Sequence, residues 1–318
     1  LALSGGAAAV DGTYRLLVCG TVTDLGGNAI DDDDDGDGND DFERNFVVDT
    51  VPPTNPTSII SSTHVHAAWS PVTGFGAEWS GATDDRSGPA GYSVVIDGNP
   101  TTAVDCTIEV ADSAGTGSTA ATLGEGAWYV HVRLIDRAGN CAVGEAEAGF
   151  WGIDTSAPGA PGAISSPSHD PVSSPVSDPT IDVAWGAASD GLSGIAGYSF
   201  HFSADEDEDC DGETDSDEDE RTALSPPLAD GSWYFHVCAV DLAGNAGPTT
   251  HGGPWIVDTT PPAGLAVSSS SHTVSTWSND AGVDFGFSGA TDANGVAGYA
   301  VEYDQASGTE PACTTTQT

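Results

Sequence analysis

The sequence predicts an all-β chain made of tandem β-sandwiches, and three observations support this prediction. A phrase recurs after about 100 residues, as GAWYVHVRLIDRAGN at 126–140 and GSWYFHVCAVDLAGN at 231–245. Within each copy, apolar and polar residues alternate with the period of a β-strand. Glycine (41 residues) and proline (19 residues) are frequent, and short strand patterns alternate with turn signals. A period of this length indicates whole domains in tandem rather than a short-repeat solenoid.

The recurring phrase predicts a strand followed by a tight turn. In the second copy, alternation places one set of side chains toward a core and the other set on the opposite face. The core-facing set is Trp233, Phe235, Val237 and Ala239, and the opposite set is Tyr234, His236, Cys238 and Val240. The Asp-x-Ala-Gly-Asn motif that follows is typical of a turn, because Gly and Asn both tolerate positive φ.

Other strands flank this phrase in a fixed order. Upstream, an aromatic strand, an acidic turn and a Gly-Tyr strand occupy 76–97, 181–202 and 283–303. Downstream, a short apolar strand leads into a linker, WGIDTSAP at 151–158 and WIVDTTPP at 255–262. A looser copy, GTYRLLVCGTVTDLGGN at 12–28, opens the chain and leads to VVDTVPP at 47–53. The linker aspartates Asp49, Asp154 and Asp258 lie 105 and 104 residues apart.

The linkers divide the chain into four parts. Residues 1–50 are the closing half of a sandwich, 51–156 and 157–260 are complete sandwiches, and 261–318 is the front half of a further sandwich. A half-sandwich exposes an open edge and half a core. We therefore expect more of the same series to complete each end, head to tail, either within a longer polypeptide or from another copy of the chain. The alternative is that the sequence is simply truncated.

The order of these elements carries a family resemblance. Over residues 51–318, the Pro-Pro linker, the Trp strand, the Gly-Tyr strand and W-Y-x-H-V-x-A-V-D-x-A-G-N resemble fibronectin type III-like repeats of bacterial surface proteins. The opening YRLLVCGTVTDLGGN resembles the closing half of a bacterial Ig-like domain of the S-layer-protein kind. The resemblance implies tandem Ig-like or fibronectin type III-like β-sandwiches. It implies little about function, because sandwiches serve many roles.

The charge of the chain limits its partners. The formal net charge is −43, from 49 acidic residues against six basic ones. A charge this negative argues against binding to nucleic acid or to an anionic membrane. No segment has the length and apolarity of a membrane-spanning helix, so membrane insertion is not expected. The acidity favours bound cations or a saline setting.

The sharpest candidate for a cation site is the segment DEDCDGETDSDE at 207–218. It fits the calcium loop D-x-D-x-D-G-x₅-E, in which alternate residues point oxygens inward and glycine permits the bend. The predicted Ca²⁺ ligands are Asp207, Asp209, Asp211, Glu213, Asp215 and Glu218. Strands rather than helices flank the loop, so a complete EF-hand is not expected. The alternative is a solvated acidic insert.

A second acidic run, DDDDDGDGNDD, occupies 31–41. Alternation predicts Ca²⁺ ligands at Asp33, Asp35, Asp37, Asn39 and Asp41. The twelfth position of this loop would be Arg44 rather than glutamate, and Glu43 would substitute only after a shift in register.

Three further groups of aspartates recur with the repeat. They lie before the Gly-Tyr strands (Asp84, Asp85, Asp190, Asp292), in the Asp-x-Ala-Gly-Asn turns (Asp136, Asp241) and in the linkers (Asp154, Asp258). We expect these residues to form turns. The alternative is that they bind Ca²⁺ between domains and stiffen the junctions.

The six cysteines occupy two kinds of position in the repeat. Cys106, Cys210 and Cys313 follow the Gly-Tyr strands, whereas Cys19, Cys141 and Cys238 lie on or just after the recurring phrase. Repeat position predicts the disulfides Cys106–Cys141 and Cys210–Cys238, and leaves Cys313 to pair with Cys19 of a neighbouring copy. Such disulfides imply an oxidising, extracellular or cell-surface setting. A zinc site is disfavoured because no C-x-x-C spacing occurs.

Catalysis is not expected. Histidines recur in each copy instead of marking one site, and the chain has no lysine, no G-x-S-x-G and no H-E-x-x-H motif. The features together predict a structural segment of an extracellular, calcium-stabilised stalk or filament. One alternative is a surface adhesin, with Tyr129 and Tyr234 as exposed contacts. Another is a non-catalytic arm of a modular extracellular hydrolase.

Overall fold

The computed structural model describes residues 10–29, 41–111 and 114–301 of the 318-residue chain. Every regular element in these residues is a β-strand. The described part therefore offers no helix long and apolar enough to cross a membrane. The chain forms two compact units, one built mainly from residues up to Ser156 and one mainly from Ala157 onward. Each unit contains one complete sandwich and one smaller two-stranded sheet.

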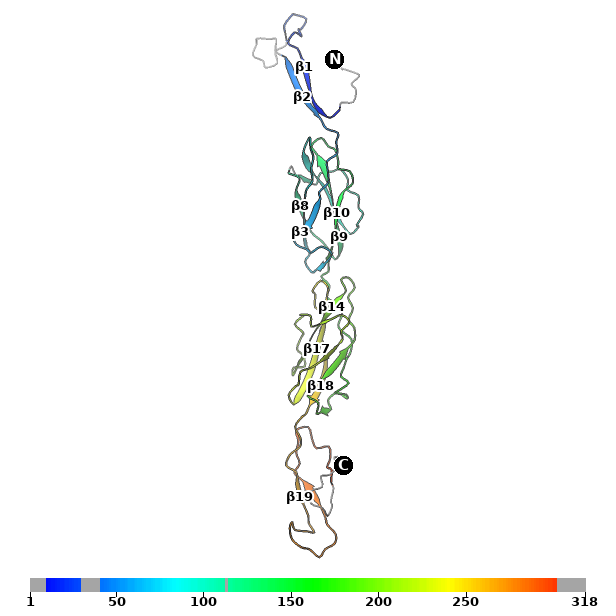
Figure 1. The fold of residues 1–318 in the computed structure, drawn as a ribbon, viewed down its shortest axis with the longest axis vertical. Helices are drawn as coiled ribbons and strands as arrows, with labels where there is room; N and C mark the ends of the chain where they lie inside the picture. Colours follow the sequence, from blue (N-terminus) through cyan, green and yellow to red (C-terminus); the bar gives the residue numbers. More distant parts are fainter. Residues whose placement is uncertain (1–9, 30–40, 112–113, 302–318) are drawn as a thin grey trace. The chain divides into compact units, whose positions relative to one another are not determined.

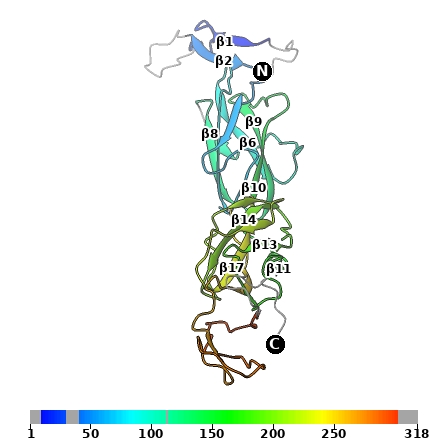
Figure 2. The ribbon, with the colours of Figure 1, turned by 60° about the horizontal axis from the view of Figure 1, so that its bottom comes forward.

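The first sandwich packs a three-stranded sheet against a five-stranded sheet (Figure 1, Figure 2). The strand orders are β3-β5-β8 and β4-β10-β9-β6-β7. All pairings are antiparallel except that of β4 with β10. The strands are β3 (Ser58–Ser61), β4 (Trp69–Ser70), β5 (Gly74–Ser80), β6 (Pro89–Asp97), β7 (Val110–Ala111), β8 (Gly117–Thr122), β9 (Gly126–Asp136) and β10 (Ala146–Ile153).

The second sandwich repeats this topology strand for strand. Its three-stranded sheet has the order β11-β13-β16 and its five-stranded sheet the order β12-β18-β17-β14-β15. The single parallel pair is again the outermost one, β12 with β18. The strands are β11 (Ile164–Ser165), β12 (Pro175–Val176), β13 (Asp182–Trp185), β14 (Ile195–Ser203), β15 (Ser216–Asp217), β16 (Thr222–Leu224), β17 (Gly231–Asp241) and β18 (Thr250–Val257).

Period-two alternation builds both cores. In β5, Phe75, Ala77 and Trp79 are buried, whereas Glu78 and Ser80 between and after them are exposed. The two sheets meet through aromatic residues that pack edge to face, a favoured geometry for aromatic rings. The Trp79 and Tyr92 ring centroids are 5.3 Å apart in the first sandwich, and those of Trp185 and Tyr198 are 5.6 Å apart in the second.

The face of β17 that points away from the core is buried, although alternation predicted that it lies at the surface. As expected, Phe235, Val237 and Ala239 face the core and are fully buried. However, His236 and Cys238 on the opposite face are also fully buried. The reason is the segment that follows β14, which the Cys210–Cys238 disulfide fastens to this face. The predicted surface staple is therefore a buried one.

The β1–β2 hairpin, β1 (Gly12–Val18) and β2 (Phe42–Val48), repeats the register of the closing hairpin in the complete sandwiches. Tyr14 pairs with Phe46 as Trp128 pairs with Trp151. The burial is opposite, because Phe46 is 53% exposed and Trp151 only 1%. No second sheet covers this hairpin within the described residues.

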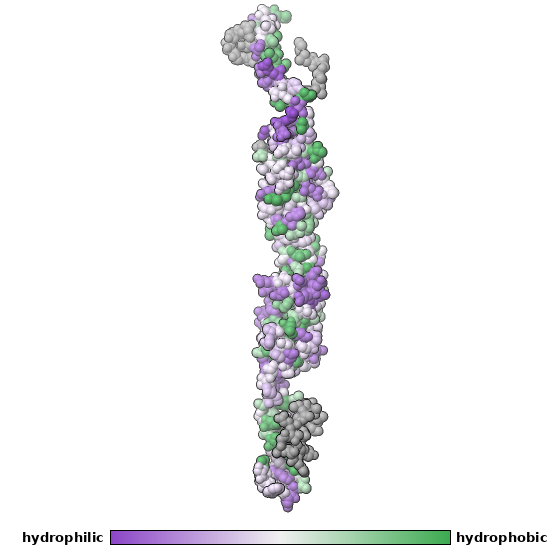
Figure 3. Space-filling model, viewed as in Figure 1, coloured by the Kyte–Doolittle hydropathy of each residue, from purple (hydrophilic) through white to green (hydrophobic). Residues whose placement is uncertain are grey.

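The C-terminal sheet, β19 (Ala266–Ser268) and β20 (Gly286–Ser288), repeats the register of β3 and β5 in the first sandwich. Val267 pairs with Phe287 as Ile59 pairs with Trp79. Phe287 is 37% exposed, against 3% for Trp79. Each small sheet thus exposes an aromatic side chain at a position that is buried in a complete sandwich. Figure 3 shows polar and apolar residues intermixed on the visible face of the complete sandwiches.

Candidate functional site

Three aspartates from separate elements converge in the first unit. Asp49 follows β2, Asp84 lies in the turn between β5 and β6, and Asp136 ends β9. One carboxylate oxygen from each lies within 4.8 Å of the others. Asp49 is 8% exposed and Asp136 is 1% exposed, and Asp84 is half-buried. Along the sequence these residues belong to three different recurring positions, which are a linker, the turn before a Gly-Tyr strand and an Asp-x-Ala-Gly-Asn turn. The fold brings one residue of each kind together.

Local turns hold each of the three carboxylates. Asp136 Oδ1 accepts a hydrogen bond from Asn140 N and Asp136 Oδ2 accepts one from Asn140 Nδ2, both at 2.8 Å. In this turn Gly139 adopts φ +89°, while Asn140 contributes through its side chain rather than through positive φ. Asp84 Oδ1 accepts from the backbone amides of Arg86 and Gly88. The turn-forming role expected for these aspartates is thus visible in their hydrogen bonds.

Further bonds tie the linker to these turns. Asn140 Nδ2 donates to the Asp49 carbonyl oxygen at 3.0 Å, and Ser87 N donates to Asp49 Oδ2 at 3.0 Å. Burial raises the pKa of Asp49, but hydrogen bonds from Ser87 and Val51 and the charge of Arg86 outweigh it, so the pKa lies below its ordinary value. Asp49 therefore stays ionised near neutral pH.

This arrangement suits a hard divalent cation. Three neighbouring carboxylates repel one another, and a bound Ca²⁺ would offset that repulsion with the oxygen ligands it prefers. Each carboxylate oxygen can accept more than one bond, so the turn hydrogen bonds leave lone pairs for a metal. The sequence repeats the same three aspartates one period later, as Asp154, Asp190 and Asp241.

The 207–218 loop is arranged differently from a calcium loop. Asp211 Oδ1 accepts hydrogen bonds from Ser199 Oγ and Glu213 N, and Asp215 Oδ2 accepts one from Phe200 N. No three acidic side chains of 207–218 have oxygens within 4.8 Å of one another. The loop uses its fifth and ninth positions to hold β14, and Ca²⁺ binding by Asp207, Asp209 and Glu218 remains a prediction.

In the first sandwich, acidic residues at equivalent positions accept the same hydrogen bonds, although that loop has no acidic run. Asp105 Oδ1 accepts from Ser93 Oγ and Thr107 N, and Glu109 Oε2 accepts from Val94 N. Hydrogen bonds from Thr107 and Ser93 hold the pKa of Asp105 below its ordinary value. Hydrogen bonds from Glu213 and Ser199 do the same for Asp211. A structural role for Asp211 and Asp215 is therefore sufficient to explain their positions.

The predicted ligands Asp33, Asp35, Asp37 and Asn39 lie outside the described residues. Asp41, at the end of that run, accepts a hydrogen bond from Gly20 N at 2.8 Å.

The structure contains the disulfides Cys106–Cys141 and Cys210–Cys238, as the repeat positions predicted. Cys19 is an exposed free thiol, and Cys313, its predicted partner from another copy, lies outside the described residues.

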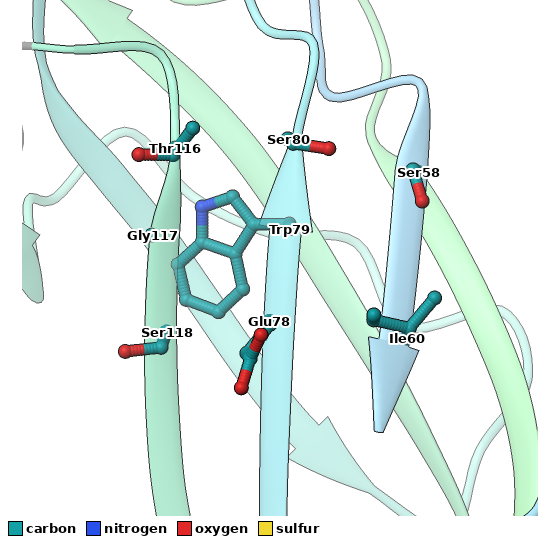
Figure 4. A pocket seen from close by; sticks show the side chains of 8 residues that line it. All are labelled: Ser58, Ile60, Glu78, Trp79, Ser80, Thr116, Gly117 and Ser118. Atoms are coloured by element: carbon teal, nitrogen blue, oxygen red, sulfur yellow. The ribbon is translucent and has the colours of Figure 1, made fainter. Parts of the chain in front are cut away.

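An open hollow of about 410 Å³ lies on the three-stranded sheet of the first sandwich (Figure 4). Hydroxyl groups of Ser58, Ser80 and Ser118 line it together with Glu78. The Trp79 indole lies against Gly117, where a Cβ atom would come within 2.5 Å of its Nε1. Trp79 Nε1 is buried without a hydrogen-bond partner. The hollow offers polar contacts, and Glu78 is the only residue with an ionisable side chain among those that line it.

No family model and no curated protein sequence matches the chain. Similar solved structures include the FN1–FN3 domains of chicken CNTN1, at 14% identity and a TM-score of 0.32, covering 76% of this chain and 77% of that one. Another is the fibronectin(III)-like modules of Clostridium thermocellum CbhA, at 13% identity and a TM-score of 0.35, covering 64% of this chain and 95% of that one. By its own strand order, a three-stranded sheet packed on a five-stranded one, each complete sandwich is an Ig-like or fibronectin type III-like β-sandwich, and the two follow one another in tandem.

Proposed function

We propose that this chain is a structural, non-catalytic segment of an extracellular stalk or filament built from tandem β-sandwiches and stabilised by Ca²⁺. The observation that carries this proposal is the repetition of a single framework. Strand order, the Asp-anchored loop and the disulfide over the five-stranded sheet recur in both complete sandwiches. A chain selected for one binding or catalytic site needs no such repetition. Two disulfides favour an oxidising, extracellular setting.

The Ca²⁺ site of this proposal is the cluster of Asp49, Asp84 and Asp136. It joins the linker to two turns of the following sandwich, so a bound ion would fix the linker to that sandwich. The 207–218 loop and the 31–41 run are further Ca²⁺ sites under the same proposal.

The proposed partners are further copies or repeats of the same chain, joined head to tail. The β1–β2 hairpin lacks a covering sheet, and the β19–β20 sheet lacks a closing hairpin within the described residues. Each has the apolar side chains that its counterpart buries in the complete sandwiches. Covering each face with the other would rebuild a core of the kind formed by Trp79, Tyr92 and Trp151.

Thermal unfolding with Ca²⁺ or with chelator tests the calcium proposal. At 100 times the dissociation constant, binding adds about 2.7 kcal/mol of stability, which raises the Tm of a domain this size by roughly 10 °C or more. Asp136→Asn should abolish the part of the response that comes from the first sandwich. Asp85→Asn is the matched control, because Asp85 is exposed and lies outside the cluster. Asp209→Asn reports separately on the 207–218 loop.

A Tm that is the same in Ca²⁺ and in chelator would contradict the calcium proposal. If the Tm response to Ca²⁺ is lost in Asp209→Asn but retained in Asp136→Asn, Ca²⁺ binds at the 207–218 loop and not at the cluster of Asp49, Asp84 and Asp136.

Sedimentation velocity over a range of chain concentrations tests head-to-tail association. Phe46→Asp or Phe287→Asp should each shift the chain toward monomer, because each places a charge on an apolar face. Ile60→Asp is the control, since Ile60 is 55% exposed on a complete sandwich. A chain that stays monomeric at every concentration would rule out copies as partners. Equal association in all variants would rule out these two apolar faces as the contact between copies.

The adhesin alternative predicts a ligand for an exposed face, and the hollow beside Trp79 is where it would bind. Saturable binding on a glycan array that Glu78→Gln abolishes would favour that alternative over the structural role.

A further inference from the structure

Three histidines form a row across neighbouring strands of the second sandwich. His201 on β14 pairs with His236 on β17, and His236 pairs with His251 on β18. Directly opposed residues of adjacent strands place their side chains on the same face of the sheet. This face is opposite to the core, since the neighbours Phe235 and Val237 fill the core.

The rings of this row are in contact. His236 Nδ1 and His251 Nδ1 are 2.8 Å apart, and the His201 and His236 rings stack with centroids 4.8 Å apart. A hydrogen bond between two imidazole nitrogens requires that one of them be unprotonated. Two nitrogens bound about 2.0–2.1 Å from one metal ion lie about 2.9–3.4 Å apart in adjacent coordination positions. The pair therefore needs to open only slightly to hold an ion.

Burial favours the form of the ring that binds metals. His236 is fully buried, whereas His251 is exposed and gives access to the pair. Burial lowers the pKa of His236, and the charges of His201 and His251 lower it further. A neutral imidazole is the ligand form of histidine. Ser203 Oγ lies 3.0 Å from His236 Nε2, which leaves Nδ1 directed at His251.

Carboxylate oxygens are close to the row. His201 Nε2 lies 3.6 Å from Glu208 Oε2. Glu208 is near His201 only, and within the described residues no third His, Cys, Asp or Glu has a ligand atom within 4.8 Å of both Nδ1 atoms of His236 and His251. Imidazole nitrogens are donors that Zn²⁺, Ni²⁺ and Cu²⁺ accept, and Ca²⁺ does not favour nitrogen. The donors at this row thus differ in kind from those of the aspartate cluster.

The first sandwich provides an internal comparison. In the same positions it has Val95, His131 and Glu147, paired strand to strand in the same way. There the His131 Nε2 atom lies 2.9 Å from the Asn99 carbonyl oxygen. The central histidine is shared by both sandwiches, and the flanking histidines occur only in the second. The flanking pair is therefore not required by the fold.

We propose that His236 and His251, with His201 beside them, form a binding site for a transition-metal ion of the Zn²⁺, Ni²⁺ or Cu²⁺ class. His236 Nδ1 and His251 Nδ1 are the chelating pair. Neither histidine of this pair is among the proposed Ca²⁺ ligands, and failure of the site would leave the structural proposal untouched.

The test is metal binding by the whole chain, without a polyhistidine tag, in excess Ca²⁺ to occupy the carboxylates. Equilibrium dialysis with Zn²⁺, Ni²⁺ or Cu²⁺ should give one tight site per chain, and the Cu²⁺ complex should show nitrogen coupling in its EPR spectrum. His251→Gln should weaken binding at least tenfold, because loss of a mere outer-shell partner already costs on the order of 10–100-fold. His201→Val should weaken it less. Both changes resemble the first sandwich, so the fold should tolerate them.

His66→Gln is the matched control, because His66 is an exposed histidine outside the row, and it should leave binding unchanged. Binding no tighter than that of the His251→Gln variant, or a Cu²⁺ spectrum without nitrogen coupling, would overturn the proposal. A loss of affinity in His66→Gln equal to that in His251→Gln would overturn it as well.

Discussion

The two complete sandwiches share a framework and differ on the outer face of the five-stranded sheet. In both, a serine on an equivalent strand, β6 or β14, donates a hydrogen bond to an aspartate of the following loop, Ser93 to Asp105 and Ser199 to Asp211. In both, a disulfide fastens the same region. Only the second has a row of three histidines and an acidic run in that loop. Residues that the fold requires are therefore the same in the two sandwiches, and residues that it does not require differ between them.

The largest predicted effect tests the shared framework. Trp151 and Trp255 are equivalent, and each is 1% exposed. Trp151→Ala and Trp255→Ala should each cost about 3–5 kcal/mol, because each leaves a cavity in a packed core. Unfolding in denaturant, monitored by hydrogen exchange of amides in each sandwich, measures the two losses of unfolding free energy separately. Trp277→Ala is the control, since Trp277 is fully exposed, and it should cost little. Strongly unequal losses for Trp151 and Trp255 would show that the two cores are not equivalent.

A slightly smaller effect is expected for the disulfides. They close loops with sequence separations of 35 and 28 residues. Loop-closure entropy predicts that each contributes about 3.5–4 kcal/mol, with a difference of only a few tenths of a kcal/mol between them. Replacing Cys106 and Cys141 together, or Cys210 and Cys238 together, by alanine tests this in urea titrations. A much larger loss in the second sandwich would indicate that burying Cys238 contributes beyond the cross-link.

The smallest predicted effect concerns the linker that follows the second sandwich. Hydrogen bonds from Thr260 and Thr259 lower the pKa of Asp230 from 3.8 to about 2. Because the folded-state pKa is depressed, this contribution to stability is present above pH 3.8 and is lost as the pH falls toward about 2. An NMR titration of the Thr259 amide should show that inflection, and Asp230→Asn should remove it. An inflection at a pH near the ordinary aspartate pKa would contradict the hydrogen bonds from Thr259 and Thr260 to Asp230.

In the first sandwich, Glu125 takes the corresponding place, accepting hydrogen bonds from Thr155 and Ser156. A longer side chain thus serves the same linker position. Asp230→Glu should therefore preserve the linker contact that Asp230→Asn weakens.

Much of the fold could be predicted from the sequence. The all-β class, the core-facing alternation of Phe235, Val237 and Ala239, and the positive φ of the turn glycine Gly139 all agree with the structure. The pairs Cys106–Cys141 and Cys210–Cys238 are also present. These features depend on strand periodicity, local turn chemistry and the position of a residue in its repeat, all of which can be read along the chain.

Tertiary structure alone decided which polar residues meet. Asp49, Asp84 and Asp136 lie far apart in sequence and converge because the linker packs on two turns. Asp211 and Asp215 bind to β14 because of the register of that strand with β15. His201, His236 and His251 become neighbours only through the pairing of three strands. Period-two alternation assigns a residue to a face, but only strand order and register determine its neighbours there.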